Sequence, residues 1–396
     1  MGKHRIAVLP GDGIGKEVTE ATMVVLEKLK LDADYRFGDV GWEFWCKEGN
    51  ALPDRTIQLL KETDVCLFGA ITSKTGDEAG KELAPSLRGK GLKYSSPIVK
   101  LRQMFDLYVN LRPCKAFAGN PLNYREGIDL IIFRENTEGL YAGVEFHPFH
   151  SEIRKVMEAY NPAIKRFSSE RDDDIAVSLR LMTKKGCHRI LEKAFEYAKR
   201  FGRRRLTLVE KGNVLRETGG LMIREAQSIA QRYPEVNFDV ANVDAMAMWL
   251  VKSPENYEVI VAENLFGDII SDLAAQLVGG LGFSASGNIG DQYAIFEPTH
   301  GSAPEVLKRK NYKGDPVPNP IATVISAAMM LDYLGYEEPS VKLEQAITNT
   351  LKGGLDIENN WQGLPRDSVP ESYRKEGKFG STTDVAQKVL EEYKLL

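Results

Sequence analysis

Short runs of β-branched and aliphatic residues alternate with longer amphipathic stretches over most of this chain. The runs that we interpret as strands are residues 5–9, 65–68, 130–133, 176–181, 206–209, 238–240 and 259–262. Apolar residues recur at helical spacing after the first run, and again within residues 184–201, 218–231 and 268–277. Strands that alternate with helices of this length predict an α/β protein with largely parallel sheets.

The length of 396 residues predicts two or three domains, because ~150 residues is a usual domain size. Residues from Ile321 onward have a mainly helical pattern, with a loop-rich interruption at 353–380. Residues 72–94 are polar, rich in Gly and Lys and without a clean period, so we interpret them as a mobile surface loop. A second polar stretch, 146–174, is interpreted as a loop or an interaction arm.

Charge and composition argue against several kinds of partner. A net charge of −4 gives no electrostatic reason to expect nucleic acid or an anionic membrane. No stretch approaches the ~18 consecutive apolar residues of a membrane span, and the opening MGKHRIAVLP predicts no secretory signal. The four cysteines form no CxxC pair and are interpreted as reduced thiols of a cytoplasmic protein.

Three aspartates are candidate metal ligands. Asp268 and Asp272, in NLFGDIISD, are four residues apart in a helix that we expect to begin near Gly267, so their side chains project from one face. Asp244, expected at the end of a strand, offers a third carboxylate. Mg²⁺ and Mn²⁺ prefer such oxygen ligands. The plainer interpretation is that Asp268 caps the start of the helix.

Three arginines are candidate ligands for carboxylates. Arg102 lies in SSPIVKLRQ, Arg112 in VNLRP, and Arg134 directly after the apolar run DLIIF. A guanidinium at the end of a strand is well placed to bind a carboxylate with two hydrogen bonds. Taken singly, each arginine is more typical of a surface ion pair. Three together indicate a small polycarboxylate ligand.

Two residues are candidates for proton transfer. Lys211 follows the predicted strand LTLVE, and Tyr141 lies in ENTEGLYAGVE, close in sequence to Arg134. Both side chains can move protons in catalysis. The alternatives are a solvated lysine and a packing aromatic ring.

Two turns could contact a nucleotide. The Gly-rich opening at residues 10–15 does not have GxGxxG spacing, and Asp12 would face a phosphate, so we interpret it mainly as a tight turn. The segment EPTHGSAPE contains His300, which is suited to stack on or hydrogen-bond an adenine.

These motifs together resemble the isocitrate/isopropylmalate dehydrogenase family of β-decarboxylating dehydrogenases. The similarity is collinear from LPGDGIG to about Leu334, and its most specific part is NLFGDIISDLAAQLVGGLGF. Supporting motifs are LRQMFDLYVNLRP, RENTEGLYAGVE, VEKGNVL and EPTHGSAP.

The resemblance implies a doubly wound mixed sheet unlike the Rossmann fold. A large cofactor-binding domain would comprise residues 1–107 and 279–396, and a small central domain for dimerisation would comprise 108–278. Residues 146–174 would form an arm or clasp between subunits of a homodimer, or of a tetramer, with shared active sites.

The resemblance also implies roles for the candidate residues. The three arginines would hold the carboxylates of the substrate, and the three aspartates would bind Mg²⁺ or Mn²⁺. Lys211 would help to remove the proton of the 2-hydroxyl, and Tyr141 would protonate the enolate carbon after decarboxylation. Asp244 and Lys211 would come from the partner subunit.

The implied cofactor site surrounds the EPTHGSAPE turn. Its residues would be His300, Gly301, Ser302, Ala303, Glu305 and Asn319. Glu305 stands where NADP-using relatives carry a basic residue. A carboxylate there accepts hydrogen bonds from ribose hydroxyls and repels a 2′-phosphate, so we expect NAD. The basic loop 306–318 leaves open a phosphate ligand, and with it NADP.

The substrate depends on a short recognition segment. Ser96 matches the serine that isocitrate enzymes use for the third carboxylate, whereas Ile98 resembles the apolar isopropylmalate pattern. Val99 stands where some bacterial homoisocitrate enzymes have an arginine, which counts against homoisocitrate. Because RENTEGLYAGVE also looks more like isocitrate dehydrogenase than isopropylmalate dehydrogenase, we expect oxidation of isocitrate to 2-oxoglutarate, a reaction of the tricarboxylic acid cycle. The alternatives are 3-isopropylmalate, homoisocitrate or another malate-type acid, and a non-catalytic regulatory subunit.

Overall fold

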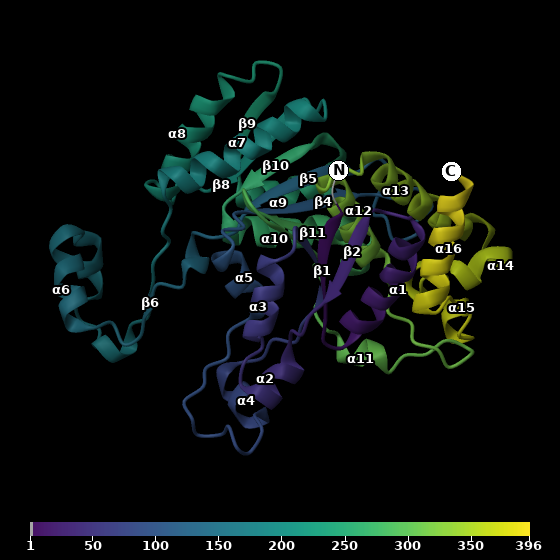
Figure 1. The fold of residues 1–396 in the computed structure, drawn as a ribbon. Coiled ribbons are helices and arrows are strands. Elements are labelled where there is room, and N and C mark those ends of the chain that lie inside the picture. The colour runs from purple at the N-terminus through teal and green to yellow at the C-terminus, as the bar shows by residue number, and fades with distance from the viewer. Residues whose placement is uncertain (1–2) are drawn as a thin grey trace.

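The computed structural model describes residues 3–396, which form one large mixed sheet with helices on both faces (Figure 1). The ten strands follow the order β2-β1-β3-β12-β11-β4-β5-β10-β8-β9. Their bounds are β1 His4–Gly11, β2 Ala33–Phe37, β3 Val65–Ala70, β4 Val109–Lys115, β5 Asp129–Glu135, β8 Arg205–Glu210, β9 Asn237–Asn242, β10 Val259–Ala262, β11 Ala285–Ile289 and β12 Ala294–Pro298. The pairs β12–β11, β11–β4 and β4–β5 are antiparallel and the others are parallel. The expected doubly wound α/β class is confirmed.

Sixteen α-helices connect and cover these strands within the described part of the chain. Their bounds are α1 Ile14–Lys28, α2 Trp42–Glu48, α3 Asp54–Lys61, α4 Gly76–Glu82, α5 Pro97–Met104, α6 Ser151–Tyr160, α7 Lys184–Arg200, α8 Thr218–Ala230, α9 Val243–Lys252, α10 Asn264–Leu277, α11 Pro304–Leu307, α12 Ile321–Tyr333, α13 Glu337–Lys352, α14 Ile357–Asn360, α15 Glu371–Lys375 and α16 Thr382–Leu395. None of the helices found in residues 3–396 has the length and apolarity needed to cross a membrane.

Alternation along the strands divides the core between the two faces of the sheet. In β5, Ile131 and Phe133 pack with α7 and α8, whereas Leu130 and Ile132 pack with α9 and α10. Strands β1 and β3 send one set of side chains to α1, α12, α13 and α16 and the other toward α3 and α5. Because both faces are covered, these strands are apolar almost throughout.

Most predicted strands are confirmed, but residues 176–181 are not a strand of the main sheet. Only β7 (Val177–Ser178) forms there, and it pairs with β6 (Glu145–Phe146) in a separate two-stranded sheet. The side chain of Arg180 turns inward to Glu210 instead. Strands β2, β4, β11 and β12 were not among the predicted runs.

The interpretation of residues 72–94 as a mobile surface loop is wrong at α4, which is a helix. A capping box between Thr75 and Glu78 starts this helix. Ala79 and Leu83 are buried in a small cluster with Trp45, whose indole nitrogen donates to the carbonyl of Ala79 at 2.9 Å. Packing against α2 therefore gives helical structure to a stretch without a clean apolar period.

Residues 146–174 stand away from the body of the molecule (Figure 1). They contain α6 and two short 3₁₀ turns, Pro162–Phe167 and Asp172–Asp174. No residue of α6 is buried, and Tyr160 is 87% exposed. The segment has the shape of an arm, and its contact with a partner subunit stays a prediction.

The close approach of β1 to β3 gives a test of the fold. Gly11 has φ +78°, and a Cβ added there would lie 2.0 Å from the carbonyl oxygen of Ala70. Gly89 has φ +77° with nothing within 4 Å. We expect Gly11→Ala to lower the free energy of unfolding by about 3 kcal/mol, and Gly89→Ala by about 1 kcal/mol, because only the first adds a clash to the backbone strain. Urea unfolding measures both, and equal losses would contradict this packing.

Candidate active site

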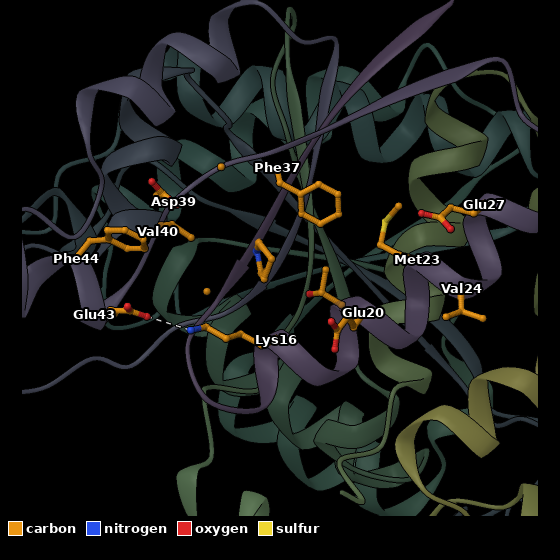
Figure 2. A pocket seen from close by; sticks show the side chains of 14 residues that line it. Lys16, Glu20, Met23, Val24, Glu27, Phe37, Asp39, Val40, Glu43 and Phe44 are labelled. Atoms are coloured by element: carbon orange, nitrogen blue, oxygen red, sulfur yellow. Dashed lines mark hydrogen bonds and ion pairs between the residues drawn. The ribbon is translucent and has the colours of Figure 1, made fainter.

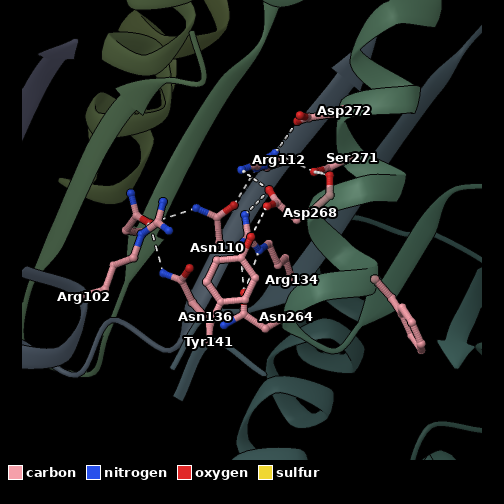
Figure 3. Close-up of polar contacts among 12 residues, drawn as sticks. Arg102, Asn110, Arg112, Arg134, Asn136, Tyr141, Asn264, Asp268, Ser271 and Asp272 are labelled. Atoms are coloured by element: carbon pink, nitrogen blue, oxygen red, sulfur yellow. Dashed lines mark hydrogen bonds and ion pairs between the residues drawn. The ribbon is translucent and has the colours of Figure 1, made fainter. Parts of the chain in front are cut away.

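Two of the three arginines lie on adjacent strands and point to the same helix (Figure 3). Arg134, on β5, donates to Oδ1 of Asn264 at 2.8 and 3.0 Å and also to Asp268. Arg112, on β4, donates to Asp272 at 2.8 Å and to Asp268 at 3.3 Å. Both guanidinium groups are buried. The structure thus brings these two arginines and the aspartate pair of α10 into one network.

Helix α10 begins earlier than expected, at Asn264 rather than near Gly267. Its N-cap is Glu263, whose carboxylate accepts a hydrogen bond from the amide of Phe266 at 2.9 Å. Asp268 lies more than one turn into the helix, so its interpretation as the cap is wrong. The side chains of Asp268 and Asp272 are 30% and 60% exposed, so both carboxylates reach the surface.

Tyr141 lies against the same network. Its hydroxyl donates to Asp268 at 2.5 Å, and the guanidinium carbon of Arg134 lies 5.0 Å from the centre of its ring. Partial burial and the hydrogen bond to Asp268 raise the pKa of Tyr141. Burial and the neighbouring guanidinium of Arg112 lower the pKa of Arg134 to about 10. An anion bound here would relieve the crowding of positive charge.

The third arginine is held by a buried asparagine that the sequence analysis missed. Asn288, on β11, accepts hydrogen bonds from Arg102 at 2.8 Å, from Asn110 at 2.9 Å and from Asn136 at 3.0 Å. It also donates to Glu297 at 2.7 Å. Asn110 alternates with Arg112 in VNLRP, and this polar alternation within a buried strand was the available signal.

One small cavity joins the substrate and cofactor candidates. It has a volume of about 160 Å³, and its lining includes Ser96, Ile98, Arg102, Arg112 and His300. Ile98 and Arg102 are four residues apart on α5 and so share a face. Val99 does not line the cavity.

The predicted cofactor turn has polar atoms without partners. The Nε2 atom of His300 and the Nδ2 atom of Asn319 are buried and make no hydrogen bond within the described chain. Burial lowers the pKa of His300, which keeps the imidazole neutral at pH 7. Gly301 joins His300 in the cavity lining, and Ala303 has a left-handed φ of 35° just before α11. Glu305 is exposed and forms an ion pair with Lys308 at 2.6 Å.

The Gly-rich opening is a tight turn, as predicted. Asp12 accepts hydrogen bonds from the amide of Trp42 at 2.7 and 2.8 Å and from that of Thr72 at 3.0 Å. The amide of Ile14 donates to the carbonyl of Ser302 at 2.9 Å. The turn therefore supports the cofactor segment through its backbone.

A larger cavity of about 750 Å³ lies beside this turn, along α1 (Figure 2). Its charged lining residues are Lys16, Glu20, Glu27, Asp39 and Glu43. The only cation among them, Lys16, already pairs with Glu43 at 3.0 Å. Carboxylates outnumber cations here, so the cavity is poorly suited to a phosphate.

Lys211 and Asp244 are separate from the network around Asp268. They form an ion pair with each other, and the hydrogen bond from Lys211 lowers the pKa of Asp244. Within residues 3–396, neither makes an ion pair with the arginines or with the other two aspartates, and no group of three His, Cys, Asp or Glu side chains could hold a metal. A single copy of the chain does not assemble the predicted three-aspartate site.

A family model for isocitrate/isopropylmalate dehydrogenase matches residues 5–361. The chain belongs to the isocitrate/isopropylmalate dehydrogenase family. This is a family of decarboxylating dehydrogenases that act on small carboxylic acids, so the family predicted from the motifs is confirmed.

Relatives and solved structures of this dehydrogenase family cover nearly the whole chain. Protein DlpA of Legionella pneumophila is 44% identical over 98% of the chain, which spans 58% of the length of that relative. A 3-isopropylmalate dehydrogenase of Archaeoglobus fulgidus is 39% identical over 88% of the chain and 92% of its own length. An isocitrate dehydrogenase structure from Methylococcus capsulatus has a TM-score of 0.80 at 33% identity, covering 98% of this chain and 99% of that one.

A buried ion cluster connects β8, the strand before Lys211, to the start of α10, and the sequence analysis missed it too. Arg180 pairs with Glu210, which directly precedes Lys211, and lies 3.6 Å from the carboxylate of Glu263. The side chains of Arg180, Glu210 and Glu263 are 9%, 0% and 2% exposed. Burial raises the pKa of Glu263.

Removal of Arg180 would leave two buried carboxylates without their cation. We expect Arg180→Met to lower the free energy of unfolding by about 3–5 kcal/mol. Arg171→Met is the matched control, because the side chain of Arg171 is 78% exposed and its ion pair with Asp173 is on the surface, and it should change stability very little. Denaturant unfolding of both variants at pH 7 measures the difference. A loss no larger than that of the control would show that the cluster is not stabilising.

Proposed function

We propose that this protein catalyses the NAD-dependent and metal-dependent oxidative decarboxylation of a 2-hydroxy-3-carboxy acid, with isocitrate as the substrate and 2-oxoglutarate as the product. The observation that carries the proposal is the cavity shared by Ser96, Arg102, Arg112 and His300. The cavity lies beside the network that contains Asp268. Its lining offers the guanidinium groups of Arg102 and Arg112 and the hydroxyl of Ser96. A polycarboxylate finds complementary charge there.

The arginines provide the substrate site in this proposal. Arg102 and Arg112 line the cavity, and Arg134 approaches from the adjacent strand. Their hydrogen bonds to Asn288, Asn110 and Asn264 orient the guanidinium groups before a ligand arrives. Ser96, just before α5, would donate to a third carboxylate.

The aspartates fit a hard divalent cation. Asp268 and Asp272 present carboxylate oxygens one turn apart on α10, and Asp244 of a second copy would add a third. When bound, Mg²⁺ or Mn²⁺ would supply Lewis acidity at the oxygen of the 2-hydroxyl.

The proton transfers are assigned to two side chains. The neutral amine of Lys211 of the second copy would accept the proton of the 2-hydroxyl, and NAD, when bound, would supply the hydride acceptor. After carbon dioxide leaves, the phenol of Tyr141 would donate its proton to the carbon that lost the carboxylate. A tyrosine phenol, with an ordinary pKa of about 10, is protonated at neutral pH.

The turn at His300 supports NAD as the cofactor. The unpartnered Nε2 of His300 and Nδ2 of Asn319 offer hydrogen-bonding atoms to a nucleotide base. The negative charge of Glu305 would repel the 2′-phosphate of NADP. Its ion pair with Lys308 uses one of the cations in the basic loop.

A homodimer would complete the site. Large apolar side chains are exposed on the surface formed by α9 and α10, and they are Met248, Trp249, Val251 and Ile269. Such a patch is typical of an interface between subunits. The same elements carry Asp244, Asp268 and Asp272, so a partner that covers them would approach the metal ligands.

The oxidation of 3-isopropylmalate is the second candidate function, and Ile98 favours it. Ile98 lines the cavity and packs with the apolar core beneath α5. A methyl-rich wall suits a branched alkyl group and disfavours a carboxymethyl group. A regulatory subunit fits less well, because the arginines, the aspartate pair and Tyr141 are assembled in one network.

An assay of NADH formation with Mn²⁺ tests the proposal. The substrates are isocitrate, 3-isopropylmalate, homoisocitrate, malate and tartrate. We expect isocitrate to give the highest kcat/KM. A higher value with 3-isopropylmalate would replace the first candidate by the second, and no NADH from any acid would contradict an enzymatic role.

Loss of one aspartate should remove the metal-dependent reaction. We expect Asp268→Asn to lower kcat by about 10³-fold or more, because a metal ligand and the partner of two arginines are lost together. A chelator should reduce wild-type activity in the same way. Asp367→Asn is the control, since Asp367 pairs with Arg366 on the surface. Activity that survives in Asp268→Asn, with the fold intact by circular dichroism, would overturn the metal assignment.

A further inference from the structure

A second large cavity lies on the face of the sheet opposite the aspartate network, and the proposed reaction does not use it. Its volume is about 610 Å³, which is within the ~300–1,000 Å³ of small-molecule sites. It opens between α7 on one side and α12 and α13 on the other, with β4, β5 and β11 beneath. Leu111 and Phe133 line its floor.

Aromatic rings form much of the wall of this cavity. On the α7 side, the ring of Tyr197 lies 5.3 Å from that of Phe133 and 4.4 Å from that of Phe201. On the α12 side, the rings of Phe296 and Tyr333 are 5.7 Å apart. The exposed fractions of Phe201 and Tyr333 are 45% and 38%. The rings therefore present apolar surface to the open space between the helices.

The charged lining of the cavity is predominantly negative. Its charged residues are Lys193, Arg200, Glu196, Asp291, Asp332 and Glu344. Both cations already have partners, because Lys193 pairs with Glu196 at 2.9 Å and Arg200 with Glu337 at 3.0 Å.

Asp332 is the carboxylate without a partner. Its side chain makes no hydrogen bond or ion pair in the part of the chain that the structure describes. It is partly buried near the end of α12, and burial raises its pKa while Arg200 opposes that rise. A carboxylate held in this way attracts a cationic group that can reach it.

We propose that this cavity binds a protonated aromatic amine, with its ring against the aromatic wall and its ammonium group at the carboxylate of Asp332. Apolar burial of the ring and cation–π contacts with Tyr197 and Tyr333 would add to the ion pair. The excess of carboxylates disfavours the binding of anions, including nucleotides, in this cavity.

The cavity and the proposed substrate site lie on opposite faces of strands β4 and β5, so different side chains of these strands line each of them. Leu111 lies between Asn110 and Arg112 on β4, and Phe133 precedes Arg134 on β5, so successive side chains point to opposite faces. Binding at the cavity can therefore be measured without substrate or cofactor. Its outcome does not depend on the proposed reaction.

Calorimetric titration of the full chain with tryptamine at pH 7 tests the proposal, with indole-3-propionate as the anion of matched shape. We expect tryptamine to bind and indole-3-propionate to bind at least tenfold more weakly. No tryptamine binding at millimolar concentration, or equal binding of the two compounds, would overturn the proposal.

Two variants that change the charge of the cavity test whether the ammonium group of tryptamine lies at Asp332. Asp332→Asn should weaken tryptamine binding about tenfold, because the charged contact is lost. Arg200→Gln should strengthen it several-fold, because a competing cation is removed. Glu338→Gln is the control, since Glu338 is on α13, outside the cavity lining, and pairs with Lys342. Unchanged binding in Asp332→Asn, or a change of the same sign in both cavity variants, would contradict the assignment.

Discussion

The ion pair between Arg134 and Asp268 is the contact on which the site depends. Arg134 is 2% exposed, and a buried guanidinium is tolerated only when its hydrogen-bonding capacity is used. Asn264 and Asp268 use it from one face of α10. The contact also fixes the helix against β5, because Gly267 allows the side chain of Arg134 to lie directly beside the helix backbone. The carboxylate of Asp268 also accepts hydrogen bonds from Arg112 and Tyr141. One aspartate therefore positions these two side chains as well as Arg134.

The separation of Lys211 and Asp244 from this network has a structural cause. Both follow strands β8 and β9, at the edge of the sheet, whereas Arg112 and Arg134 lie on β4 and β5 near its centre. Strand β10 separates β5 from β8 in the sheet order. In the proposed function, Lys211 acts on a substrate that is held by the arginines of a second copy. The exposed apolar side chains of α9 and α10 indicate where such a copy would pack.

The apolar strands and the main motifs could be predicted from the sequence because they follow strong local patterns. Runs such as VCLFGA and DLIIFRE are buried on both sides, and a continuous apolar run is a clear signal. Strands β11 and β12 could not be recognised in this way. Their sequences, ASGNI and AIFEP, contain Asn288 and Glu297, which are buried only because they satisfy each other and Arg102.

The motifs pointed to Arg112, Arg134, Asp268, Asp272 and Tyr141, which the structure brings into one network, but they did not predict the contacts that support this network. Asn288 as the acceptor for Arg102 and Arg180 as the cation between two glutamates both depend on pairings across 30 or more residues of sequence. Local patterns carry no information about such pairings. Helix α4 shows the same limit, because its stability comes from Trp45 rather than from its own period.

The central claim is that each active site uses residues of two copies, and subunit mixing tests it most directly. Asp268→Asn and Lys211→Met should each be inactive alone. After denaturation and refolding of an equal mixture, half of the dimers are mixed and each mixed dimer regains one intact site, so activity should return to about one quarter of the wild-type value. Activity that stays at the level of the separate variants, with mixed dimers shown to form, would contradict a shared site.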